Sequence, residues 1–111
     1  MKIGEITSLL NAKVYVQGDT DREITGVIAG DLLSFIMGTA NENSAWITIQ
    51  THLNVAAVAV LKDLPLIIIA SDRVPAEELI ERCKEENISI ISLPYSLYEA
   101  CNRMYEFGYK K

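Results

Sequence analysis

The segment "LIIIASDRVPAEELIERCKEENISIISL" (residues 66–93) decides the fold class of this chain. It begins with a short apolar run, continues through a charged stretch with helical spacing, and ends in a second apolar run. Strands that are apolar on both faces and separated by helices are typical of a largely parallel sheet covered on both sides. The segment therefore predicts a strand, a helix that begins at Pro75, and a second strand.

The same alternation of strands and helices extends along the rest of the chain. Further strands are expected over residues 13–17, 23–29 and 45–50, and helices over residues 3–11, 30–39, 53–61 and 96–107. Asp31 is expected to cap the helix 30–39, and Ser96 with Glu99 forms a capping-box pattern at the last helix. We therefore predict a single α/β domain over residues 1–111, with three α/β/α layers and a largely parallel or mixed sheet of about five strands.

Composition and charge argue against several classes of function. The formal net charge is −5 and the chain has no basic run, so we expect no nucleic-acid partner. No phosphate-binding loop with its lysine is present in the sequence, which disfavours a kinase or an ATPase. One histidine and two cysteines at no recognised ligand spacing predict neither a metal site nor a bound cofactor.

Membrane insertion and secretion are not expected either. The first residues, "MKIGEITSLLN", are amphipathic and carry Glu5 where a signal peptide would be apolar. Lys62 and Asp63 interrupt the most apolar stretch, which falls short of the roughly 20 apolar residues that a membrane span needs. Cys83 and Cys101 are isolated, which suits reduced thiols and predicts a cytoplasmic protein.

Four strand-to-helix loops carry the candidate binding residues. Right-handed crossovers place such loops at the carboxyl edge of a parallel sheet, where the ligands of open α/β sheets bind. The loop "QTHLN" (50–54) holds the only histidine of the chain at the start of an apolar helix. His52 could hydrogen-bond a ligand when neutral and attract an anion when protonated, beside helix-start amides that also favour anions. The candidate ligand-binding residues are Asp31, Thr51, His52, Asn54, Ser71 and Asp72.

A plainer interpretation is open for the same residues. Thr51 and Asn54 are residue types that cap helix starts, and His52 would then lie at the surface or at a subunit contact. Asp72 near a helix start complements the helix dipole whether or not a ligand binds. The sequence identifies no second catalytic group beside His52, so an acid–base role is disfavoured and we predict no catalytic residue.

The last helix predicts a subunit interface. The segment "YSLYEACNRMYEFGY" (95–109) holds more large apolar and aromatic side chains than one small core is expected to bury. Large apolar patches seldom stay exposed on monomers. We therefore expect Tyr98, Cys101 and Tyr105 to contact a second copy of the chain in a homodimer, the commonest kind of symmetric oligomer.

Three segments carry a resemblance to a known family. They are "GDLLS" (30–34), "AWITIQTHLNVAAVA" (45–59) and "ISIISLPYSLYEA" (88–100), and together they resemble a stand-alone DRTGG-domain protein over nearly the whole chain. The fold of that family resembles the N-terminal domains of HPr kinase/phosphorylase and of the Mur ligases. The resemblance implies an accessory regulatory domain with no reaction of its own.

The chain departs from the family signature at two loops. His52-Leu53 stands where the resemblance would place Asp-Arg, and residues 70–72, "ASD", stand in place of Thr-Gly-Gly. The segment "QTHLN" also resembles a subgroup of this family whose members accompany histidine-kinase-like ATPases and iron hydrogenase components. Both loops are thus retained while the signature residues in them are replaced.

The sequence supports two functional hypotheses. The first is a non-catalytic, homodimeric regulatory module that binds a small anionic or nucleotide-like ligand at the carboxyl edge. Binding would act by population shift on the dimer or on a docking surface. The alternative is a pure interaction module that docks a partner enzyme, such as a histidine-kinase-like ATPase or a hydrogenase component.

Overall fold

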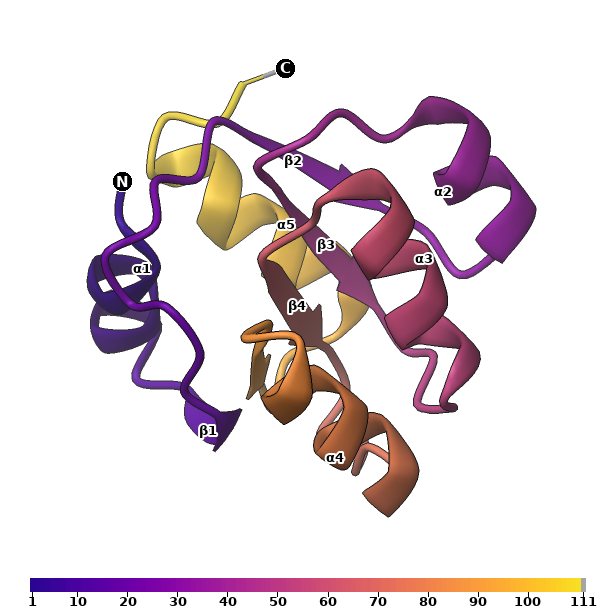
Figure 1. Ribbon diagram of the computed structural model, residues 1–111. Helices are drawn as coiled ribbons and strands as arrows, with labels where there is room; N and C mark the ends of the chain where they lie inside the picture. Colours follow the sequence, from indigo (N-terminus) through magenta and orange to yellow (C-terminus); the bar gives the residue numbers. More distant parts are fainter. Residues whose placement is uncertain (111) are drawn as a thin grey trace.

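A mixed five-stranded sheet forms the centre of the computed structural model, which describes residues 1–110 (Figure 1). The strands are β1 (Lys13–Val16), β2 (Gly26–Ala29), β3 (Ser44–Thr48), β4 (Leu66–Ile69) and β5 (Ser89–Ser92). Their order across the sheet is β1-β5-β4-β3-β2. Strands β2 to β5 are parallel, while β1 pairs antiparallel with β5 at one edge. The predicted α/β class with a largely parallel or mixed sheet is confirmed.

Five helices cover the two faces of the sheet. They are α1 (Ile3–Leu10), α2 (Leu33–Thr39), α3 (Asn54–Lys62), α4 (Glu77–Glu85) and α5 (Leu97–Glu106). One buried cluster joins α2, α3 and α4 to one face of the sheet, and a second joins α1 and α5 to the other face. The strands β3, β4 and β5 are buried along their whole length because both of their faces are covered. The structure therefore has the three predicted layers.

Two predicted helix starts are wrong. Asp31 does not cap α2, because Leu32 is the N-cap residue and no side chain caps this helix. Pro75 is not the first residue of α4, which begins at Glu77 after the N-cap residue Ala76. The amide of Ala76 donates instead to the carbonyl oxygen of Thr51 at 2.9 Å, which keeps the segment before α4 extended.

The last helix begins as the sequence predicts. Ser96 is the N-cap residue of α5, and its hydroxyl accepts a hydrogen bond from the amide of Glu99 at 3.2 Å. This bond satisfies one of the amides that a helix start leaves without an intrahelical partner. Within residues 1–110, no helix combines the length and the apolarity that crossing a membrane would require.

Candidate functional site

The carboxyl ends of the four parallel strands bring four loops to one edge of the sheet. Hydrogen bonds connect these loops across the edge. The amides of Ser71 and Asp72 donate to the carbonyl oxygens of Tyr95 and Leu93, at 2.6 and 2.8 Å. The bond from Ala76 to Thr51 joins the loop after β3 to the loop after β4. The edge is therefore a connected surface, and we call these four loops the carboxyl edge.

Asp31 links the loop after β2 to the end of β3. Its carboxylate oxygen Oδ1 accepts hydrogen bonds from the hydroxyl of Thr48 and from the amide of Ile49, both at 2.8 Å. The side-chain amide of Gln50 donates back to the carbonyl oxygen of Asp31 at 2.9 Å. A carboxylate held in this way stabilises the loop, and it presents less of its acceptor capacity to a ligand than an unpaired one.

The loop before α3 separates a buried residue from two exposed ones. Thr51 is buried, whereas His52 and Asn54 are exposed. Neither Thr51 nor Asn54 caps the helix, because no side chain accepts from its first amides. The amides of Val55 and Ala56 donate instead to the carbonyl oxygens of His52 and Leu53, at 3.0 and 2.9 Å. The capping interpretation of these two residues is thus wrong. The start of α3 remains without a side-chain cap, beside the only imidazole of the chain.

Ser71 and Asp72 adopt an uncommon backbone conformation. Their φ angles are 60° and 58°, in the left-handed region that glycine occupies most easily. These are the positions where the resemblance would place two glycines. The loop keeps the left-handed path although its residues carry side chains, and both of those side chains are exposed. Ser71 and Asp72 thus project from the same edge as His52.

Two features of the carboxyl edge were missed by the sequence reasoning. Gln50 and Thr48 hold Asp31, although an alternating strand pattern gave no sign of a polar network at its end. Three large apolar side chains are also exposed at the helix starts: Leu32 (67%), Leu53 (48%) and Val74 (66%). The sequence could have indicated this exposure, because the three residues come just after predicted strands, in loops where apolar side chains are not needed for the core.

The residues described by the structure place neither a reactive thiol nor a metal-binding cluster at the carboxyl edge. Burial is the main cause that raises the pKa of the Cys83 thiol to about 12, but Cys83 lies on α4 inside the core. A thiol with so high a pKa is a poor nucleophile at neutral pH. No cluster of three or more metal-binding side chains occurs among residues 1–110.

The candidate interface residues share one side of α5. Tyr98 is 84% exposed, Tyr105 is 53% exposed, and Cys101 between them is half-buried. Their spacing of three and four residues puts them on neighbouring turns of the helix. The structure therefore brings the three residues together as a surface strip of α5.

The architecture defines the class of protein. It is a three-layer α/β domain in which strand-to-helix loops gather at the carboxyl edge of a largely parallel sheet. The chain belongs to the DRTGG domain family, whose model matches residues 5–107. The sequence resemblance to this family is confirmed. No curated protein sequence matches the chain.

A solved structure supports the fold. The chain is similar to a crystal structure of the CBS and DRTGG domains of the regulatory region of Clostridium perfringens pyrophosphatase, complexed with the activator diadenosine tetraphosphate. The TM-score is 0.76 at 19% sequence identity, and the match covers 91% of this chain. It covers 44% of the clostridial chain in that crystal structure, so the present chain spans less than half of that chain's length.

Proposed function

We propose that this chain is a non-catalytic regulatory module that binds a small anionic or nucleotide-like ligand at the carboxyl edge. The observation that carries the proposal is the exposed pair His52 and Asn54 at the uncapped start of α3. The dipole at a helix start favours negative charge, and a histidine beside it adds a hydrogen-bond donor. On the neighbouring loop, the hydroxyl of Ser71 would donate to the ligand, and the carboxylate of Asp72 would accept from a hydroxyl or amino group of the ligand instead of contacting its phosphates.

The family and its structural relative support this assignment. The clostridial regulatory region, of which a DRTGG domain is part, was crystallised with a nucleotide activator that carries four phosphates. Ligands of open α/β sheets bind outside the carboxyl ends of the strands, which is where the four loops lie here. A role in sensing a phosphate-rich ligand agrees with both facts. Asp31 would act as the brace that holds the loop after β2, rather than as a contact.

The proposed mechanism is a shift of population between two states of an interface. We assign the homodimer contact to the strip of Tyr98, Cys101 and Tyr105 on α5. The loop before α5 is bonded to the loop after β4 through Ser71 and Tyr95. A ligand that orders residues 71–72 would therefore act on the segment that leads into α5. Native mass spectrometry tests the dimer, and Tyr98→Ser combined with Tyr105→Ser is expected to convert it to a monomer.

Isothermal titration with diadenosine tetraphosphate tests the binding site. His52→Ala is expected to weaken binding by roughly tenfold, which corresponds to the loss of one charge-assisted hydrogen bond of about 1.4 kcal/mol. Glu42→Ala is the matched control, because Glu42 is exposed in the loop before β3, away from the carboxyl edge. Equal affinities of wild type and His52→Ala would remove His52 from the site.

A second candidate function rests on the exposed apolar side chains of the same edge. Leu32, Leu53 and Val74 lie at the starts or just before the starts of α2, α3 and α4, which pack side by side in one layer. Such a row suits docking to another protein. The candidate partner is an enzyme such as a histidine-kinase-like ATPase or a hydrogenase component. In this case that partner would raise the melting temperature, Leu53→Ser would abolish the effect, and nucleotides alone would leave the protein unchanged.

A further inference from the structure

The outer edge of β2 carries backbone groups that no strand of residues 1–110 pairs. β2 is the last strand of the sheet, and β3 is its neighbour on the inner side. The register sets Ala29 opposite Ile47 of β3, and the amide of Gly30 donates to the carbonyl oxygen of Ile47 at 3.0 Å. In a parallel pair, such a residue bonds to the two residues that flank its opposite number, so Ile28 and Gly30 face β3. The amides and carbonyl groups of Val27 and Ala29 therefore point away from the sheet.

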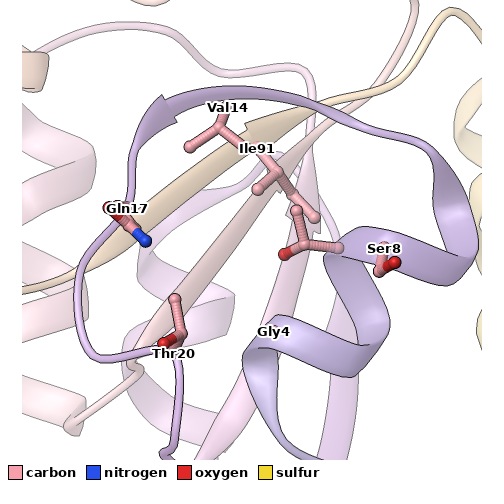
Figure 2. Close-up of a pocket in the computed structure, with 7 residues that line it drawn as sticks. Gly4, Ser8, Val14, Gln17, Thr20 and Ile91 are labelled. Atoms are coloured by element: carbon pink, nitrogen blue, oxygen red, sulfur yellow. The ribbon is translucent and has the colours of Figure 1, made fainter.

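The two edges of the sheet differ in how they are protected. At the β1 edge, Lys13 is exposed and the pairing with β5 is irregular between Val14 and Val16. Figure 2 shows side chains of α1 and of the loop after β1 beside Val14, around a shared hollow. Lysine side chains and bulges keep a sheet edge from pairing with another chain. The β2 edge, "TGVIAG" (25–30), has no charged residue and no proline, and its register with β3 is regular.

The surface that adjoins the β2 edge is apolar and nearly uncharged. Residues 24–41 contain one charged side chain, Asp31, whose carboxylate is already hydrogen-bonded to the end of β3. Phe35 of α2 is 52% exposed and, with Ile28, lines a hollow of about 320 Å³ between α2 and β2. Outward amides and carbonyl groups beside apolar surface select an occupant that is itself a strand with apolar side chains.

We infer that β2 pairs antiparallel with β2 of a second copy of the chain, so that the two sheets join into one continuous sheet. The inference rests on the homodimer proposed above and adds a contact to it. A two-fold axis beside Ile28 sets Val27 opposite Ala29 of the second copy. Both residues present their amide and carbonyl groups outward, so the pair exchanges two N–H···O bonds and the axis repeats them. Every outward group of β2 is then bonded, which makes this edge complementary to itself.

The same two-fold axis brings the two α5 helices together. Helix α5 packs over β2 and β3 on one face of the sheet. With a strand spacing of about 4.8 Å, α5 lies about 2.4 Å inside β2, and the two-fold axis lies about 2.4 Å outside it. The two α5 helices are then about 10 Å apart, which is within the range of packed helices. Edge pairing and the α5 strip of Tyr98, Cys101 and Tyr105 therefore fit one dimer.

Amide hydrogen exchange of the full chain tests the edge contact, at a protein concentration where sedimentation shows a dimer. The amides of Val27 and Ala29 are expected to exchange within roughly tenfold of the rate of Ile28, which is bonded to β3 in either state. A dimer in which these two amides exchange more than roughly a hundredfold faster than Ile28 overturns the edge contact and leaves the homodimer standing. A chain that stays monomeric overturns both the homodimer and this contact.

Substitutions of Ala29 separate the edge contact from the fold. Ala29 is exposed, and proline is tolerated on an edge strand where the lost N–H faces away from the sheet. Ala29→Pro removes an outward donor and is expected to weaken dimerisation by roughly tenfold or more, with an unchanged circular dichroism spectrum. Ala29→Lys, which places a charge on the edge, is expected to weaken it likewise, whereas the matched control Ala29→Ser keeps the donor. Equal dimer dissociation constants of wild type, Ala29→Pro and Ala29→Lys would overturn the inference.

Discussion

Replacement of Asp31 by alanine tests the hydrogen-bonded brace at the end of β3. The substitution removes the acceptor of two bonds of 2.8 Å and leaves the fully buried hydroxyl of Thr48 and the amide of Ile49 without their partner. Each bond to a charged acceptor contributes about 1.5–3 kcal/mol, and water that reaches the half-buried Asp31 position recovers part of that. We expect the free energy of unfolding to fall by about 2–4 kcal/mol, which for a domain of this size is a drop of roughly 8–16 °C in Tm.

Circular dichroism melts and urea titrations of three variants measure this effect. Asp31→Asn keeps the acceptor oxygen and loses the charge, so its loss of stability should be about 1 kcal/mol. Glu42→Ala is the control, because Glu42 is exposed and makes no hydrogen bond or ion pair among residues 1–110. An Asp31→Ala protein that melts within the error of the Glu42→Ala protein would refute the brace and return Asp31 to the set of free ligand contacts.

Three further predictions concern backbone strain, thiol reactivity and pH. Because φ is 60° at Ser71, Ser71→Gly is expected to leave the free energy of unfolding unchanged or raise it by up to about 1 kcal/mol, and Ser71→Val to lower it by about 2 kcal/mol. Urea titration measures both changes. A loss of more than about 1 kcal/mol in the glycine variant would contradict the prediction. In the Tyr98→Ser/Tyr105→Ser protein, which is expected to be a monomer, a thiol reagent at pH 8 should modify Cys101 and spare Cys83, whose pKa burial raises to about 12; peptide mapping that finds Cys83 modified first would be the opposite result. Burial raises the pKa of Tyr109 above its ordinary value of 10.0, so this phenol stabilises the fold below pH 10 and the contribution is lost as the pH rises through the higher folded pKa. Tyr109→Phe should therefore flatten the alkaline decline of stability, at a cost near neutral pH of about 1 kcal/mol for the bond to the carbonyl oxygen of Ile24; an equally steep decline in the variant would contradict it.

The sequence was a good guide to the layers of this fold because its strands are unusually apolar. The run "LIIIA" is apolar at every position, so a strand formed by it has to be buried on both faces, and β4 is indeed buried at every position. The helix starts were predicted less well. Asp31 and Pro75 carry the residue types of helix caps and first turns, but tertiary hydrogen bonds to β3 and to Thr51 use those segments differently. Local preference was overridden there by contacts between loops that are distant in the chain.

The sequence predicted the position of the candidate site better than it predicted the hydrogen bonds of the side chains in it. The parallel topology placed His52, Asn54, Ser71 and Asp72 at one edge, as the alternating pattern required. The engagement of Asp31 by Thr48 and Gln50 depends on side-chain geometry that no periodicity encodes.

Titration of the ¹⁵N-labelled protein with diadenosine tetraphosphate and with inorganic tripolyphosphate tests the central claim most directly. The account predicts saturable amide shifts at residues 50–54 and 71–76, with an affinity that falls as salt is added because the ligand is an anion. The His52→Ala protein should show smaller shifts at the same residues. Saturable shifts in neither loop with either compound would contradict the proposal that the carboxyl edge binds a small anionic ligand.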